Sequence, residues 1–326
     1  MAELHVLQLD RAIKAGDVAN IAKALDEGAS PDGDKNAGKK PIHLAVETGL
    51  VQITKLLLER GANLNVANPE DHGRRPLHMA VVRGFDKIVK CLLERNADPN
   101  LVDGAGEPPL ITAVKKGELS SVALLLKYGA DVHKRDANHN SAMLIAVEKS
   151  HGEIVQMLLK EGAPAYNINM SGDGTIHVAA RKCSTWILEM LREKGCDINK
   201  SNRDGSFPLH LAAESGNLEA VQWFLLNGAK LNARDEDGKT AADRAADARQ
   251  RHVVDWFNDQ KVLNKRLLAM AQRGDAEGVR RLAEGGVDLE AVSLLPGQTG
   301  TVIRTCTCIT NFIICLFKGG KIVTCR

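Results

Sequence analysis

The chain has 326 residues, of which 44% are hydrophobic and only 3% aromatic, so its core must be built from aliphatic side chains. Its 43 Lys and Arg residues and 41 Asp and Glu residues give a net charge of +2, and the last 26 residues hold four basic side chains and no acidic one. The first 300 residues therefore carry a charge of −2, which gives no electrostatic basis for nucleic-acid binding.

The cysteines and the N-terminus indicate an intracellular protein. Seven cysteines form an odd number without the spacing of a secreted disulfide framework. Glu3, Asp10 and Arg11 interrupt the first eleven residues, so we expect no signal peptide. No apolar stretch reaches the roughly 18 residues of a membrane span. We therefore expect a cytoplasmic protein, with the nucleus as the alternative.

Residues 1–34 are the first predicted segment. Leu7 to Pro31 has the helical pattern of the repeats described next but lacks their Pro-Leu-His start. A segment of this kind at the start of an array predicts a capping repeat with a polar outer face.

A fixed period governs residues 37–258. One slot that favours proline recurs with a first step of 35 residues and five further steps of 33, at Pro41, Pro76, Pro109, Ala142, Thr175, Pro208 and Ala241. A constant period in this range indicates stacked supersecondary units. We place the repeats at residues 37–67, 72–102, 105–135, 138–168, 171–201, 204–234 and 237–258.

The second repeat shows the chemistry of the unit. Pro76 suits the first position of a helix, and Gly84 can end that helix in a left-handed turn. The apolar residues from Ile88 to Leu93 then form one stripe of a second helix. Two helices of about ten residues are not stable alone in water, so each repeat must bury its stripe against its neighbours. The predicted fold is all-α, a solenoid of helix-turn-helix units.

These motifs resemble the ankyrin-repeat family. The helix starts read Lys40-Pro-Ile-His-Leu-Ala, Arg75-Pro-Leu-His-Met-Ala and Phe207-Pro-Leu-His-Leu-Ala, and the repeat ends read Gly61-Ala-Asn-Leu-Asn, Gly129-Ala-Asp-Val-His and Gly195-Cys-Asp-Ile-Asn. The resemblance covers roughly Leu4 to Val292. It implies short β-hairpin tips, an L-shaped stack and protein–protein binding.

Two segments follow the array. Residues 263–292 repeat the style of the opening segment, and we predict the truncated start of a second ankyrin stack. Residues 293–326 have no ankyrin phase, and we expect a non-homologous, disordered tail. A lipidated or partner-binding tail is the alternative.

Four histidines, His43, His78, His177 and His210, fall at one repeat position. A ladder of metal sites is one interpretation, but stacked helices lie about 10 Å apart and zinc needs its ligands at about 2 Å. Hydrogen bonding within and between repeats, which the resemblance implies, is favoured. We expect no metal, cofactor or catalytic residue, because the chain has no phosphate-binding loop, dinucleotide fingerprint, HExxH motif or nucleophile elbow.

The position just before the first helix of each repeat is usually Thr in the family, but most repeats of this chain have another residue there. It reads Lys40, Arg75, Pro108, Ser141, Gly174, Phe207 and Thr240. Only Ser141 and Thr240 can cap a helix with a hydroxyl, and each lost cap costs ~1 kcal/mol. We therefore expect an array less stable than the family consensus.

The middle repeats depart from the family in a second way. Ser150 and Cys183 stand where other repeats have glycine between their two helices. These departures are either neutral variation or the mark of a segment where the stack bends or opens more easily.

The resemblance also implies a partner-binding face, since ankyrin partners meet the hairpin tips and the exposed end of the first helix. The candidate residues are Arg74, Arg83, Glu107, Lys115, Lys116, Glu148, Lys149, Arg181, Lys182, Asp204 and Glu214. Basic residues recur in the middle repeats and favour an acidic or phosphorylated partner segment. A solvated charged face is the alternative. Trp186 is either an exposed anchor or part of a repacked core.

Two functions remain open. The first is a monomeric, non-catalytic scaffold that binds an unidentified protein. The alternative is a regulatory fragment or isoform of a larger multidomain signalling protein, such as an enzyme, and the expected second stack at 263–292 favours it.

Overall fold

The computed structural model describes residues 2–34, 39–182, 184–259, 301–308, 311–318 and 321–325. The chain divides into two compact parts, an N-terminal part, Met1–Thr175, and a C-terminal part, Ile176–Arg326. The expected second stack at residues 263–292 and the turn residue Cys183 lie outside the described residues. The domain boundaries drawn from the sequence remain predictions.

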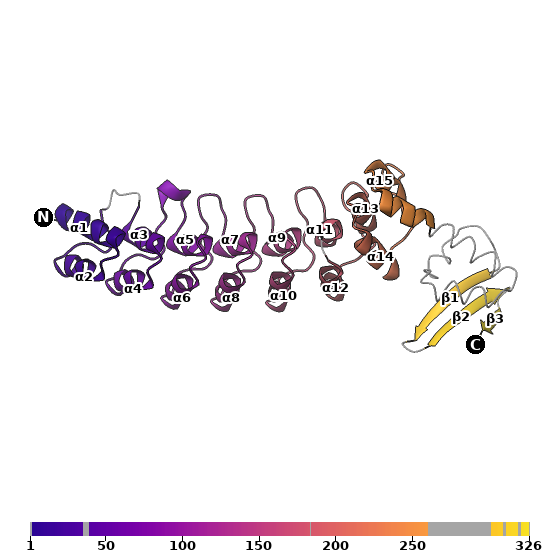
Figure 1. The fold of residues 1–326 in the computed structure, drawn as a ribbon, viewed down its shortest axis with the longest axis horizontal. Coiled ribbons are helices and arrows are strands. Elements are labelled where there is room, and N and C mark those ends of the chain that lie inside the picture. The colour runs from indigo at the N-terminus through magenta and orange to yellow at the C-terminus, as the bar shows by residue number, and fades with distance from the viewer. Residues whose placement is uncertain are drawn as a thin grey trace. The chain divides into compact units, whose positions relative to one another are not determined.

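The N-terminal part is built from five helix pairs. Figure 1 shows the first helices of the pairs in one row and the second helices in another. The first, or inner, helices are α1 (Ala2–Ala15), α3 (Pro41–Thr48), α5 (Pro76–Val82), α7 (Pro109–Lys116) and α9 (Ala142–Glu148). The second, or outer, helices are α2 (Val18–Asp26), α4 (Val51–Glu59), α6 (Asp86–Glu94), α8 (Leu119–Lys127) and α10 (Gly152–Lys160). Neighbouring helices pack against one another along each row.

The C-terminal part continues the pattern of helix pairs. Its helices are α11 (Thr175–Lys182, whose first residue closes the N-terminal part), α12 (Thr185–Glu193), α13 (Pro208–Glu214), α14 (Leu218–Leu226), α15 (Ala241–Asp247) and a last helical segment over residues 251–259. The helical array and its repeat confirm the predicted solenoid.

Three strands lie within residues 293–326, for which we expected disorder. They are β1 (Thr301–Cys308), β2 (Asn311–Lys318) and β3 (Lys321–Cys325). They pair antiparallel in the order β1-β2-β3, with Val302 opposite Phe317 and Leu316 opposite Val323. Their Thr, Ile and Val content has high β-propensity, which accounts for the strands.

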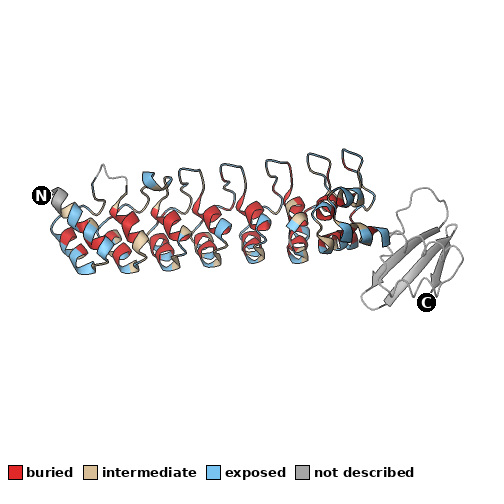
Figure 2. Ribbon diagram, turned by 45° about the horizontal axis from the view of Figure 1, so that its top comes forward, coloured by how far each residue is buried: buried red, intermediate tan, exposed pale blue. Residues whose placement is uncertain are grey.

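The second repeat folds as its residues predict. Pro76 stands in the first turn of α5, and Gly84, with φ +69°, reverses the chain after it. The stripe of α6 is fully buried, and Asn96 follows with φ +65°. In the N-terminal part, buried residues concentrate where the two rows of helices face each other (Figure 2). The core is aliphatic, as the composition requires.

Three of the repeat histidines hold the loops that lead toward the next repeat. The imidazoles of His43, His78 and His210 each bond through Nε2 at 3.0 Å to a carbonyl that leads into the next repeat. Burial is the main cause that lowers the pKa of these three histidines. They are therefore neutral structural groups, as the predicted hydrogen-bonding role requires.

The helix starts confirm the expected shortage of caps. Ser141 Oγ accepts from Leu144 N at 3.1 Å, and Thr240 Oγ1 accepts from Asp243 N at 3.3 Å. The side chains of Lys40, Arg75 and Phe207 cap nothing. At Lys40 the helix start is satisfied in part by His43, whose Nδ1 accepts from Lys40 N at 3.1 Å.

Candidate functional site

The hairpin tip before α5 is extended by the two extra residues of the first repeat step. The extended tip holds a short 3₁₀ helix of three residues, Pro69–Asp71, and an isolated antiparallel bridge joins Asn68 to Arg74 at its base. Arg74 Nη1 lies 3.1 Å from Asp71 Oδ1, so this candidate residue is held by its own tip. A hollow of about 280 Å³ beside it is lined by His72, Arg74, Asp103, Gly104, Ala105, Glu107 and Thr112.

Two of the candidate residues, Glu107 and Lys115, bind each other. Lys115 Nζ contacts the Glu107 carboxylate and lies 3.3 Å from Asp136 Oδ2, a carboxylate that is 5% exposed. Glu107 also accepts a hydrogen bond of 2.8 Å from Thr112 Oγ1. Burial lowers the pKa of Lys115, but the two carboxylates outweigh it and the pKa is raised overall. Lys115 is therefore neutralised by Glu107 in its own repeat and by Asp136 in the loop that leads to the next repeat, and is not a free surface charge.

Three other basic candidates remain exposed at the same repeat position. Arg83, Lys116 and Lys149 each stand at the C-terminal end of an inner helix, α5, α7 and α9 respectively, and we call them the basic row. Arg83 has one acidic neighbour, Glu47, whose Oε1 is 3.5 Å away and which also binds Lys39 at 2.6 Å. Within the described residues, Lys116 and Lys149 form no ion pair.

The other candidates also lie on the surface, and Lys182, the last residue of α11, stands at the repeat position of the basic row. Glu148 is exposed next to Lys149. In the C-terminal part, Lys182, Asp204 and Glu214 are exposed, and Arg181 is half-buried.

An exposed apolar hairpin is a feature that the sequence analysis missed. Tyr166, Ile168 and Met170 are 38%, 43% and 65% exposed on the segment before α11, while Asn167 between them is buried. Buried Asn167 donates through Nδ2 to Pro164 O at 2.7 Å and accepts from Arg135 at 3.2 Å, which turns its neighbours outward. The sequence does contain a signal for this feature. At the positions of Tyr166 and Ile168 the preceding repeat has the polar residues His133 and Arg135. Trp186, in the C-terminal part, is 48% exposed.

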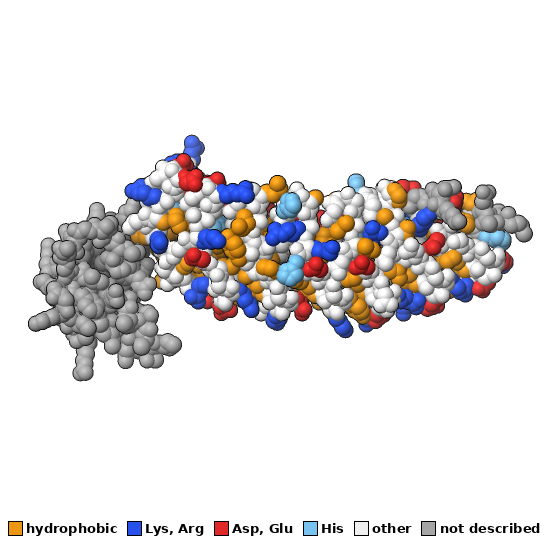
Figure 3. Space-filling model, turned by 180° about the vertical axis from the view of Figure 1, so that it is seen from behind, with side chains coloured by type: hydrophobic (Ala, Val, Ile, Leu, Met, Phe, Trp, Pro, Cys, Tyr) orange, Lys and Arg blue, Asp and Glu red, His pale blue; other side chains and the backbone are white. Residues whose placement is uncertain are grey.

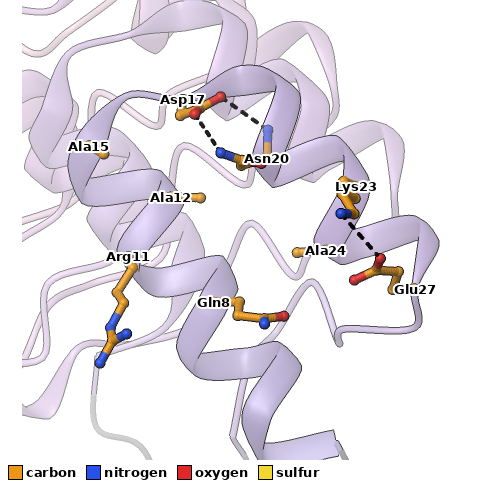
Figure 4. A pocket seen from close by; sticks show the side chains of 9 residues that line it. All are labelled: Gln8, Arg11, Ala12, Ala15, Asp17, Asn20, Lys23, Ala24 and Glu27. Atoms are coloured by element: carbon orange, nitrogen blue, oxygen red, sulfur yellow. Dashed lines mark hydrogen bonds and ion pairs between the residues drawn. The ribbon is translucent and has the colours of Figure 1, made fainter.

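A groove of about 350 Å³ lies between α1 and α2, in the segment that precedes the first repeat (Figure 4). Its walls are Gln8, Arg11, Ala12, Ala15, Asp17, Asn20, Lys23, Ala24 and Glu27. Asp17 accepts from Asn20 N at 3.0 Å and from Asn20 Nδ2 at 2.6 Å, and Lys23 lies 3.8 Å from Glu27. These polar groups pair with one another, as befits the outer face of a capping repeat.

Charged and apolar side chains are mixed on the surface that Figure 3 shows. On the face drawn in Figure 3, basic, acidic and hydrophobic side chains are interspersed, so no field of one sign covers that face. The described residues contain no cluster of His, Cys, Asp and Glu side chains suited to a metal ion. None of the helices in the described part of the chain is both long and apolar enough to cross a bilayer.

Comparison with known proteins agrees with the geometry. A family model described as ankyrin repeats (3 copies) matches residues 9–103, 88–171, 110–202 and 176–266. The crystal structure of the human ASB11 ankyrin repeat domain matches with a TM-score of 0.54 and 28% identity, over 64% of this chain and 92% of that one. No curated protein matches the sequence.

Proposed function

The chain belongs to the ankyrin-repeat family, and from this premise we propose that it is a scaffold that binds a protein partner on its hairpin tips and inner-helix ends. Ankyrin repeats are generally protein–protein interaction modules, and such domains are typically non-catalytic. The partner segment we propose is acidic or phosphorylated.

The basic row is the observation that carries this proposal. Lys116 and Lys149 are exposed at the same repeat position, whereas neighbouring Lys115 is taken up by Glu107 and Asp136. A lysine at a helix C-terminus also favours its own helix by a few tenths of a kcal/mol, up to about 1 kcal/mol, so exposure alone does not establish binding. The repetition of the charge over three stacked repeats supports a partner of opposite charge.

A charge-reversal experiment with a matched control tests the site. The double variant Lys116→Glu with Lys149→Glu reverses both unpaired charges. The control, Lys127→Glu with Lys160→Glu, makes the same change at the last residues of the outer helices α8 and α10. Proteins retained from native cell extract by the full chain would be quantified for the wild type and both variants. We expect the partner to be lost with the first variant and retained with the control.

The same experiment separates the two kinds of anion. Treatment of the extract with a phosphatase would abolish retention of a phosphorylated partner and leave an acidic one unchanged. Equal retention by both charge-reversal variants would reject the inner-helix face as the binding site.

A further inference from the structure

Hydrogen bonds and helix packing join the repeats that carry the basic row, and Arg135 of the third repeat donates to Asn167 of the fourth at 3.2 Å. Asn65 Oδ1 accepts from Asp98 N at 3.2 Å, and Asn100 Oδ1 accepts from Asp131 N at 2.7 Å, so the same slot bonds to the next repeat twice in succession. The inner helices α5, α7 and α9 also pack directly against one another. Arg83, Lys116 and Lys149 are therefore separated by one helix-packing distance each, about 8–10 Å.

This spacing discriminates between backbone conformations of a bound segment. A polyproline II helix has three residues per turn and rises about 3.1 Å per residue, so every third side chain lies on one face about 9 Å from the last. A β-strand places side chains of one face about 7 Å or about 13 Å apart. An α-helix repeats near this distance only every seventh residue, at about 10.5 Å, and is itself 10–12 Å wide.

We propose that the basic row binds an extended protein segment in the polyproline II conformation whose acidic side chains recur at every third residue. One carboxylate then meets each of Arg83, Lys116 and Lys149. This inference rests on the proposed acidic partner and adds the backbone conformation and the spacing of its charges.

The energetics favour the same ligand. A single exposed ion pair contributes little because water and salt screen it, so the segment must engage all three basic residues. A polyproline II segment is already extended in solution and loses little conformational freedom on binding. Arg83 can exchange its 3.5 Å contact with Glu47 for a closer ligand carboxylate.

The test measures how tightly three dye-labelled peptides, each with four glutamates, bind to the full-length chain by fluorescence anisotropy. The first peptide has four Glu-Pro-Pro triplets. The second has the same residues with its glutamates gathered in adjacent pairs, and a third is an acidic helical peptide with glutamate at every seventh position. We expect the triplet peptide to bind at least about fivefold more tightly than the other two, and to weaken as salt rises.

Protein variants complete the design. Lys116→Glu with Lys149→Glu should weaken the triplet peptide about tenfold, whereas Lys127→Glu with Lys160→Glu should change its affinity by less than about twofold. Thermal melting of both variants verifies that they are folded. Equal affinity of all three peptides, each lost with Lys116→Glu and Lys149→Glu, would overturn the spacing and conformation while leaving the proposed acidic site intact. Absence of binding, or binding that neither variant changes, would overturn both.

Discussion

Arg75 and Lys40 occupy the same slot before an inner helix, yet the fold uses them differently. The Arg75 guanidinium donates to Asn65 O, and to Val102 O at 3.3 Å, and so joins two consecutive hairpin loops. The Lys40 ammonium donates to Asp34 O, at 2.6 Å. A hydroxyl in this slot would cap the helix, but at Arg75 it would also remove the two bonds that join consecutive hairpin loops.

This difference predicts opposite effects of one substitution. Lys40→Thr should raise the free energy of unfolding by ~1 kcal/mol through the restored N-cap. Arg75→Thr should lower it, because two hydrogen bonds from a charged donor are worth more than the ~1 kcal/mol that a cap returns. Urea unfolding of both variants measures the two changes. Stabilisation by both would show that the Arg75 contacts contribute nothing.

The adjacent residues Lys115 and Lys116 show what the repeat position of a residue can predict and what it cannot. The repeat period correctly assigned both to the end of an inner helix. It could not tell that Lys115 would reach Asp136 in the next repeat, because a long flexible side chain selects its partner only after the repeats have stacked. Local chemistry, by contrast, was predictable: Ser141 and Thr240 cap their helices because the bond joins residues three apart.

At the scale of elements, the extended tip before α5 is locked to the following hairpin. Gly104 N donates to His72 O at 2.8 Å, and a β-carbon added to Gly104 would meet that same oxygen at 2.6 Å. The 35-residue step revealed the insertion in the sequence. Its conformation was not predictable, because it depends on this backbone contact with a loop some thirty residues away.

The substitution Gly104→Ala tests this backbone contact between the two hairpins. The new methyl group would have to push apart two backbone segments, and we expect a loss of ~1–3 kcal/mol of stability. Ala105→Ser is the matched control, since Ala105 is exposed in the same loop and surface changes of this kind stay within about 0.5 kcal/mol. Differential scanning calorimetry should show a lower melting temperature for Gly104→Ala alone. If the two variants melt together, the tip moves freely and the lock is absent.

At the scale of the whole molecule, the bonds between repeats are unevenly distributed. In the N-terminal part, His43 and His78 bind the loop that enters the next repeat. The corresponding positions in the next two repeats hold the buried apolar residues Ile111 and Leu144, which cannot form this bond. Because a repeat array is stabilised by the sum of its repeats and their interfaces, it can open locally where those terms are small. Residues 105–168 should therefore exchange amide hydrogens faster than residues 37–102.

Ser150 adds a conformational cost to that same region, and its removal gives the sharpest test. Ser150 has φ +58° at the turn between α9 and α10, where the three preceding repeats have Gly49, Gly84 and Gly117. A left-handed conformation costs an L-residue ~1–2 kcal/mol, and glycine avoids this cost. Glycine also loses more conformational entropy on folding, so the substitution stabilises the protein by only part of that amount. Ser150→Gly should therefore slow exchange in residues 138–168 by roughly two- to fivefold, measured by hydrogen exchange with mass spectrometry. Ser150→Ala keeps the strained φ and should give no gain. Equal protection of all repeats in the wild type, or equal slowing by both substitutions, would contradict a locally weakened array.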